Sequence, residues 1–136
     1  MVHPISDLQA SIISALSADT QLISAIGSDA VFDMPPRGKS APYIVILRHD
    51  LIAHDADISP GHDHRIQIQI WHNDPSRAAV LVLADRVIEV MAGTDLSSLT
   101  LNVSHIQHDR TETAIDRKSG QARALLAFRV FSEPVV

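Results

Sequence analysis

Histidines are the residues of this chain that could bind a metal, because the sequence contains eight of them and no cysteine. His62 and His64 flank Asp63, and on a strand side chains two positions apart point to the same face. The further ligands available nearby are His54, Asp55 and Asp57. Zinc needs three or four convergent ligands, and two histidines without a helical H-E-x-x-H motif are a weak signal for such a site. We therefore expect a solvated polar hairpin here, with no metal and no cofactor.

The other candidates for acid–base chemistry fall into two small groups. His49 and His105 could act as general bases with Asp50, and His108 could do so with Asp109. The sequence has no G-x-S-x-G nucleophile motif, no phosphate-binding loop and no G-x-G-x-x-G motif. We therefore expect no catalytic residues and no enzyme. A small metal-dependent hydrolase that uses the histidine-rich segment is the alternative. A metal assay on pure protein distinguishes this hydrolase from a protein without catalytic function.

The composition predicts one globular domain over residues 1–136. Hydrophobic residues make up 46% of the chain and charged residues 20%, which suits a single folded core. The net charge of −5 disfavours a duplex-binding domain, which would usually be basic. No apolar run reaches the ~18 residues of a membrane-spanning helix, and the N-terminus lacks the basic start of a secretory signal. We therefore expect a soluble protein, made and used in the cytoplasm, with no membrane partner.

The clearest structural unit is a strand followed by a helix, over residues 65–93. Isoleucines at every second position from 66 to 70 predict a half-buried strand. Trp71 follows on the opposite face, with Gln67 and Gln69, so its indole is expected either under a loop or at a subunit boundary. Asp74 is the expected N-cap of the helix, with Pro75 in the first turn and Gly93 as a left-handed C-cap.

The apolar arc of this predicted helix, residues 74–92, is wider than one sheet requires. Its core stripe consists of Val80, Leu81, Ala84, Val87, Ile88 and Met91. Leu83 and Val90 extend the arc to roughly half the circumference at ~100° per residue, and Val82 falls outside it among charged residues. Two interpretations stay open. This flank contacts the N-terminal helix, or it meets another subunit.

The other predicted elements make the chain an α+β protein. Residues 6–26 form two helices, the first capped by Ser6 or Asp7 and the second by Asp19 with Gly27 at its end. The remaining strands are expected over residues 30–32, 43–47, 96–103, 109–114 and 122–131, with 43–47 central and a bulge near residues 104–105. Strands on either side of one long helix favour a mostly antiparallel sheet, with the N-terminal helix and the long helix packed on one face.

A long polar segment, residues 48–64, is the expected docking element. Its acids, histidines and Pro60-Gly61 indicate an extended loop or a hairpin tip, and loops this long usually have a function or are disordered. Leu51, Ile52 and Ile58 are its few apolar anchors for a partner. The alternative is a hairpin whose apolar residues fold back on their own sheet. The expected interaction residues of the chain are Leu51, Ile52, Ile58, Trp71, Val82, Leu83 and Val90.

Several segments of the chain form a familiar series in a fixed order. They are residues 8–19, 31–36, 41–46, 66–71, 84–88 and 128–134, and they include Pro42-Tyr43-Ile44-Val45 and the alternating strand that ends in Trp71. This series resembles the tail-completion family of long-tailed phages, also described as tail terminator or head–tail joining proteins, with relatives in prophages and phage-like gene transfer agents. The resemblance spans nearly the whole chain, matches least over residues 48–64, and carries no catalytic motif.

The resemblance implies a small α+β subunit that assembles into a ring, usually a hexamer. The ring would cap the finished tail tube and join it to the head connector, in a virion or phage-like particle assembled in the bacterial cytoplasm. The implied partners are further copies of the chain, the tail tube protein and head–tail connector proteins. DNA would pass through the lumen without specific binding, which an acidic protein suits. The alternative within the same particle is a head-side adaptor protein.

Overall fold

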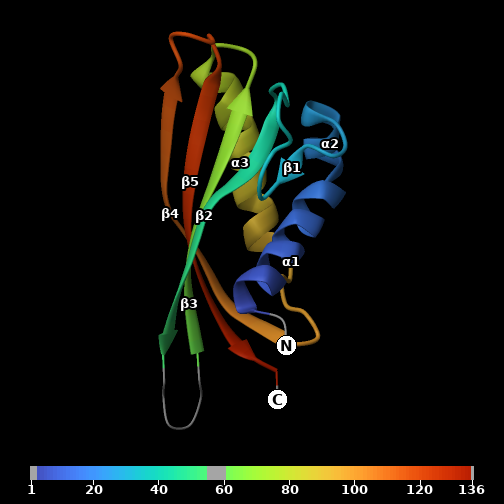
Figure 1. Cartoon of the computed structure of the whole chain (residues 1–136), viewed down its shortest axis with the longest axis vertical. Coiled ribbons are helices and arrows are strands. Elements are labelled where there is room, and N and C mark those ends of the chain that lie inside the picture. The colour runs from blue at the N-terminus through green and yellow to red at the C-terminus, as the bar shows by residue number, and fades with distance from the viewer. Residues whose placement is uncertain (1–2, 55–60, 136) are drawn as a thin grey trace.

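The computed structural model describes residues 3–54 and 61–135, which form one helical layer on one sheet (Figure 1). The elements in chain order are α1 (Pro4–Ala18), α2 (Thr20–Ile26), β1 (Val31–Phe32), β2 (Tyr43–His54), β3 (Gly61–His72), α3 (Arg77–Gly93), β4 (Leu101–Ile115) and β5 (Ala122–Pro134). The strand order is β1-β2-β3-β5-β4. Only the short β1 runs parallel to its neighbour, and all other pairs are antiparallel. The predicted α+β class with a mostly antiparallel sheet is confirmed.

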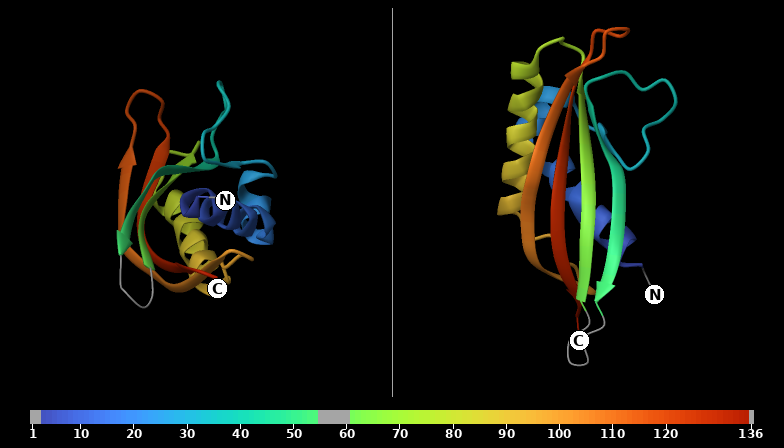
Figure 2. Two further views of the ribbon diagram at one scale, coloured as in Figure 1. Left: turned by 60° about the horizontal axis from the view of Figure 1, so that its bottom comes forward. Right: turned by 90° about the vertical axis from the view of Figure 1, so that its left-hand side faces the viewer.

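All three helices lie on the same side of the sheet, which curves around them (Figure 2). Within residues 3–54 and 61–135 the opposite side carries no helix, and we call it the helix-free face. The core lies between the two layers, where the predicted isoleucine face of β3 is completely buried. Ile68 pairs with Ile46 of β2 and Leu126 of β5, and each of these side chains is at most 4% exposed. Period-two alternation therefore places the core side of every long strand toward α1 and α3.

The helix ends differ in part from the prediction. His3 caps α1, because its ring Nδ1 accepts a hydrogen bond from the Ile5 amide and Pro4 occupies the first turn. Ser6 and Asp7 are therefore helical residues rather than caps. Asp19 caps α2 as expected, and Gly27 ends it with φ 87°, a left-handed conformation that glycine adopts without a steric penalty.

The long helix begins later than the sequence suggests. Ser76 Oγ accepts from the Ala79 amide and is the N-cap of α3. Asp74 is not the cap, because it lies in the turn before the helix, where its backbone amide donates to His72 Nδ1. Gly93 is the last helical residue, and Thr94 ends the helix in an extended conformation. Gly93 is therefore not a left-handed C-cap.

Two strands are longer than, or shifted from, their predicted ranges. The strand expected over residues 43–47 continues to His54 and lies next to the edge of the sheet rather than at its centre, since β1 covers only two of its residues. Most of the segment 48–64 is thus the two arms of a hairpin, and residues 55–60 lie outside the described residues. The strand expected over 96–103 begins only at Leu101. The bulge near residues 104–105 is confirmed, and a second one lies between His108 and Arg110.

Two side-chain clusters join the helices to each other and to the loop before β4. Arg86 of α3 binds Asp19 at the α1–α2 junction through two contacts of 2.6 and 2.9 Å. Asp7 of α1 accepts from the hydroxyls of Ser98 and Thr100, in the loop that precedes β4. In the described part of the chain, no helix is long and apolar enough to cross a membrane.

Candidate functional site

Two of the histidines singled out from the sequence, His49 and His64, lie on the core side of the sheet, not in a solvated loop. His64 follows the isoleucine face of β3 and is completely buried. Its Nδ1 lies 2.8 Å from His49 Nε2 on β2, and its Nε2 lies 2.8 Å from Ser132 Oγ on β5. Three neighbouring strands therefore share one continuous hydrogen-bonded chain. Polar groups at core positions normally need such partners.

These hydrogen bonds suit neutral imidazole rings at His49 and His64. Burial lowers the pKa of His64 to about 4, and the neighbouring His49 and His62 act in the same direction. Burial likewise lowers the pKa of His49 to about 4. His49 Nδ1 is buried without a hydrogen-bond partner, and an orphan acceptor costs less than an orphan N–H. We therefore assign the proton of both rings to Nε2, so that His49 donates to His64 and His64 donates to Ser132.

This cluster does not have the accessibility that hydrolysis requires. The Ser132 side chain is completely buried, so no substrate carbonyl can approach its hydroxyl in this conformation. Among the described residues, no three or more His, Asp or Glu side chains are placed to hold a metal ion. His105 lies on the exposed strand β4, three strands away from His49. The structure therefore does not bring His49 and His105 together. His108 Nε2 lies 3.0 Å from the Arg110 carbonyl oxygen and 2.9 Å from Thr111 Oγ1, whereas Asp109 accepts from Gln107 Nε2.

The predicted interaction residues divide between core and surface. Leu83 and Val90 of α3 are 5% and 6% exposed and belong to the core, whereas Val82 is 69% exposed. Leu51 pairs with His64 and is half-buried. Ile52 pairs with Asp63 on the helix-free face and is 49% exposed. Ile58 lies outside the described residues. The docking role of the segment 48–64 stays a prediction.

Trp71 lies on the helix-free face, opposite the isoleucines, as the alternation predicts. It pairs with Tyr43 of β2 and Arg123 of β5. Its indole N–H donates to Gln69 Oε1 at 3.0 Å, and the Arg123 guanidinium carbon lies 5.9 Å from the centre of the indole. A surface hollow of about 420 Å³ adjoins it, lined also by Ile115 and other residues around the β4–β5 turn. Trp71 is half-buried, and its role at a subunit boundary stays a prediction.

Aromatic residues are concentrated on the same face. The chain has five Phe, Tyr and Trp residues. Only Phe128 points into the core, whereas the strand registers place Phe32, Tyr43, Trp71 and Phe131 on the helix-free face. Sequence periodicity predicts this placement for Trp71 alone, because residues 43–47 are apolar at every position and show no alternation.

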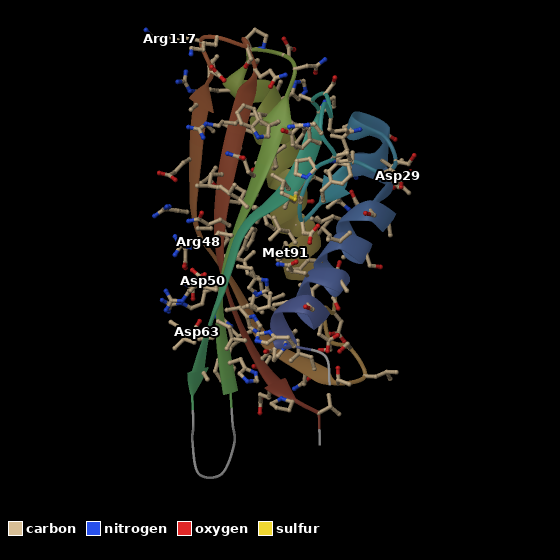
Figure 3. All side chains as sticks on the ribbon, viewed as in Figure 1. Asp29, Arg48, Asp50, Asp63, Met91 and Arg117 are labelled. Atoms are coloured by element: carbon tan, nitrogen blue, oxygen red, sulfur yellow. The ribbon has the colours of Figure 1, made fainter. Side chains whose placement is uncertain are left out.

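Arginines lie among these aromatic rings. Arg48, Arg65 and Arg110 line one hollow of about 230 Å³ that spans β2, β3, β5 and β4. Each is paired with a carboxylate two positions away on its own strand: Asp50 at 2.7 Å, Asp63 at 3.2 Å and Glu112 at 3.3 Å. Figure 3 shows the labelled Arg48, Asp50 and Asp63 pointing away from the helices, while Met91 is buried between the layers.

Comparison with known proteins identifies a family and a shared fold. A family model described as "Tail completion protein gp17" matches residues 10–133. A chain from a solved structure titled "Virion of native gene transfer agent (GTA) particle" superimposes with a TM-score of 0.83 at 24% sequence identity, covering 97% of this chain and 99% of that one. A search of curated proteins finds no match.

Proposed function

The chain belongs to the tail completion protein gp17 family, and we propose that several copies of it form a ring that caps the tail tube of a phage or phage-like particle. The ring joins the tube to the head connector and leaves a channel for DNA. The observation that carries this proposal is the family match over residues 10–133, which covers both layers of the fold. The chain is thus a structural protein of the particle, and its proposed place is the head–tail joint.

A ring needs two different surfaces on each subunit, because only head-to-tail contacts repeat around an axis. The two-layer architecture supplies them, since one side consists of helices and the other of bare sheet. We propose six copies as the stoichiometry, on the resemblance of the chain to tail terminators. The partners of such a ring are further copies of the chain, the tail tube protein and the head–tail connector proteins, with DNA in the lumen but not specifically bound.

Absence of catalysis is part of the proposal. The Ser132 hydroxyl is buried, and burial lowers the pKa of both His64, in the core, and the half-buried His49. These features suit a structural hydrogen-bond chain between strands. Protein purified without chelator is expected to contain no stoichiometric zinc, manganese or iron by elemental analysis. A bound metal that disappears in a His62→Ala, His64→Ala variant contradicts this part of the proposal.

Electron microscopy of particles that lack this protein tests the proposed role. A tail terminator is needed to stop the tube and to join it to the head, so over-long tails and separate heads are expected. Complementation with the intact chain restores particles with tails of fixed length. Tails of normal length on particles with a defective head vertex indicate a head-side adaptor instead. Particles that carry the protein without a ring of it at the joint exclude the ring.

A further inference from the structure

We propose that neighbouring copies of the chain join edge to edge, so that the bare edge of β4 on one copy pairs with the bare edge of β2 on the next. This inference rests on the proposed ring and places its contacts at the edges of the sheet. A strand at a sheet edge presents unpaired N–H and C=O groups and accepts a further strand. The partner that each edge needs is an extended strand, and every copy carries one at its other edge.

The first bare edge belongs to β4, the last strand in the sheet order. Its inner side pairs with β5 from end to end. The preceding loop covers only the start of its outer side. There Ser98 bonds to Leu101 through both its backbone amide and its hydroxyl, and Ser97 Oγ accepts from the Val103 amide. Within the described ranges, no strand pairs with the outer side of residues 104–115.

The second bare edge belongs to β2, on the other side of the sheet. The short strand β1 pairs only with Ile44 and Val45. Among the residues that the structure describes, no strand pairs with the outer side of β2 from Ile46 to His54. The right-hand view of Figure 2 shows β2 and β4 as the two outermost of the four long strands. Each edge is therefore covered near the start of its strand and bare beyond it.

The directions of the strands suit a contact that repeats around an axis. Each long strand is antiparallel to the next in the order β2, β3, β5, β4, so β2 and β4 run in opposite directions. A ring whose axis lies along the strands keeps these directions in every copy, because rotation about that axis inverts none of them. β4 of one copy then meets β2 of the next as an antiparallel pair, which continues the pairing of the rest of the sheet.

The covered part of β4 restricts the register of this pairing. If the two edges met level with each other, Ala53 would lie opposite Val103, whose amide the loop already occupies. A shift of two residues toward the end of β4 moves Ala53 to Ile106 and brings residues 46–53 opposite bare backbone. An even shift also keeps the core side and the helix-free face of the two strands aligned. The eight residues would contribute about eight backbone hydrogen bonds, a number typical of a protein interface.

The same shift places opposite charges next to each other. Arg48 and Asp50 of β2 lie on the helix-free face, as do Arg110 and Glu112 of β4. With a shift of two residues, Arg48 lies opposite Glu112 and Asp50 lies opposite Arg110. With no shift the two arginines would be opposite each other, and with a shift of four the two acids would be. Opposite charges in facing positions stabilise a strand pair and like charges destabilise it, so the charges select the shift of two.

These four side chains are accessible to a partner, since each is between 51% and 66% exposed. Within one copy Arg48 binds Asp50 and Arg110 binds Glu112, in each case through one guanidinium nitrogen and one carboxylate oxygen. Guanidinium groups have five N–H donors and carboxylates have two oxygens, so both kinds of group can bind a second partner. Asp109 is displaced from the register by a bulge and accepts from Gln107 of its own strand. The complementarity therefore lies in the order of the charges along the two edges.

Disulfide trapping tests the register, since the chain has no cysteine of its own. Directly opposite residues of an antiparallel pair have Cα atoms about 4.5–5.5 Å apart, which a disulfide can span. Oxidation of particles assembled from an Asp50→Cys, Arg110→Cys variant is expected to give a ladder of covalent oligomers on non-reducing gels. Each single variant is expected to stay monomeric. The matched control is Asp50→Cys with Asn102→Cys, whose second thiol lies roughly 20 Å further along β4 and should give no ladder.

The outcomes separate this inference from the proposed function. If oxidised particles show a ring of the protein at the joint but no ladder, the edge contact is overturned and the ring stands. A covalent dimer from Arg110→Cys alone means that two β4 edges meet each other, which also overturns it. Cross-links from either thiol to a different particle protein do the same. Wild-type particles without a ring of the protein contradict the proposed function itself.

Exchange of charges provides an independent measurement. Arg48→Asp with Asp50→Arg keeps the net charge and the ion pair within β2, but it reverses the order of charges along that edge. We expect about tenfold lower incorporation into particles, because like charges then meet across the contact. Adding Arg110→Glu with Glu112→Arg on the same chain restores opposite pairs and should recover incorporation.

The control exchange lies away from both edges. Asp74→Arg with Arg77→Asp, at the start of α3, also keeps the net charge and is expected to incorporate normally. Circular dichroism of the free variants checks that they fold. Equal loss of incorporation in the two-residue and four-residue exchanges on the edges would overturn the pairing, and so would normal incorporation of both.

Discussion

His64 occupies a core position that an aliphatic side chain could fill. It is accepted there because both ring nitrogens have partners, His49 on one side and Ser132 on the other. A buried polar group that is fully hydrogen-bonded avoids the penalty of desolvation. The consequence is a dependence on protonation, because a charged imidazole would need two acceptors, while His49 Nε2 is a donor in the assigned arrangement.

Acid is therefore expected to destabilise the fold through this residue. The pKa of His64 is about 4 in the folded protein against 6.5 for an ordinary histidine. Between these values the unfolded chain binds more protons, so stability is complete above pH 6.5 and falls as the pH drops toward 4. The loss from His64 alone is about 3 kcal/mol, since one pKa unit corresponds to about 1.4 kcal/mol. Urea unfolding at a series of pH values measures it.

The charged groups that influence this histidine are His3, His49, His62 and Asp63, and among them Asp63 alone favours its protonation. In a His64→Gln variant the slope of stability against pH from 6.5 to 4 should become shallower, whatever its absolute stability. His105→Gln, on the exposed strand β4, is the control and should keep the wild-type slope. Equal slopes for wild type and His64→Gln would show that the buried hydrogen bonds of His64 do not control the loss of stability in acid.

At the scale of elements, one aspartate organises the helical layer. Asp19 caps α2 by accepting from the Leu22 amide and also binds Arg86 of α3. Its side chain is only 10% exposed, and that of Arg86 is 29% exposed. Hydrogen bonding to Arg86 lowers the pKa of Asp19. The short helix α2 therefore depends on one residue both for its start and for its attachment to α3.

Removing this carboxylate should loosen the helical layer. Asp19→Ala loses the cap, worth about 1 kcal/mol, and removes one of the two carboxylates that bind Arg86, which keeps Glu89, so we expect a destabilisation of roughly 1–2 kcal/mol. Asp19→Asn keeps the cap and loses only the charge. We expect it to destabilise the protein about half as much as Asp19→Ala does. Urea unfolding compares the two with Asp85→Ala, an exposed acid on the same helix, which should change stability by less than about 0.5 kcal/mol. Equal losses for Asn and Ala would mean that the cap contributes nothing.

At the scale of the whole molecule, one buried cluster includes residues from α1, α2, α3 and all five strands. We propose that the chain is a single folding unit, because no part of either layer has a core of its own. Unfolding is then a single cooperative transition, as in most small domains. Far-ultraviolet circular dichroism reports the helical layer, and fluorescence of Trp71, the only tryptophan, reports the helix-free face. The two probes are expected to give the same midpoint, and loss of helix before the fluorescence change would indicate two units.

Local patterns were sufficient for much of the fold. Alternation located β3, the core side of β5 and the face of Trp71, because a strand has period two wherever it lies. Side-chain capping at Asp19 and the glycine at the end of α2 were predictable, since both depend on residues close in the sequence. The order of segments was sufficient to indicate the family. These features need no knowledge of which strand lies beside which.

Only the tertiary structure decided how the described part of the polar segment 48–64 is arranged. Its histidines suggested a solvated hairpin, yet His64 is buried in the core, hydrogen-bonded to His49 and to Ser132, which lies 68 positions away from His64 in the chain. The same holds for Leu83 and Val90, whose burial depends on α1 and α2 packing beside α3. On the helix-free face, Arg65 and Arg129 lie opposite each other because β3 pairs with β5. Such neighbours are set by sheet order, and sheet order is a long-range property that no local pattern contains.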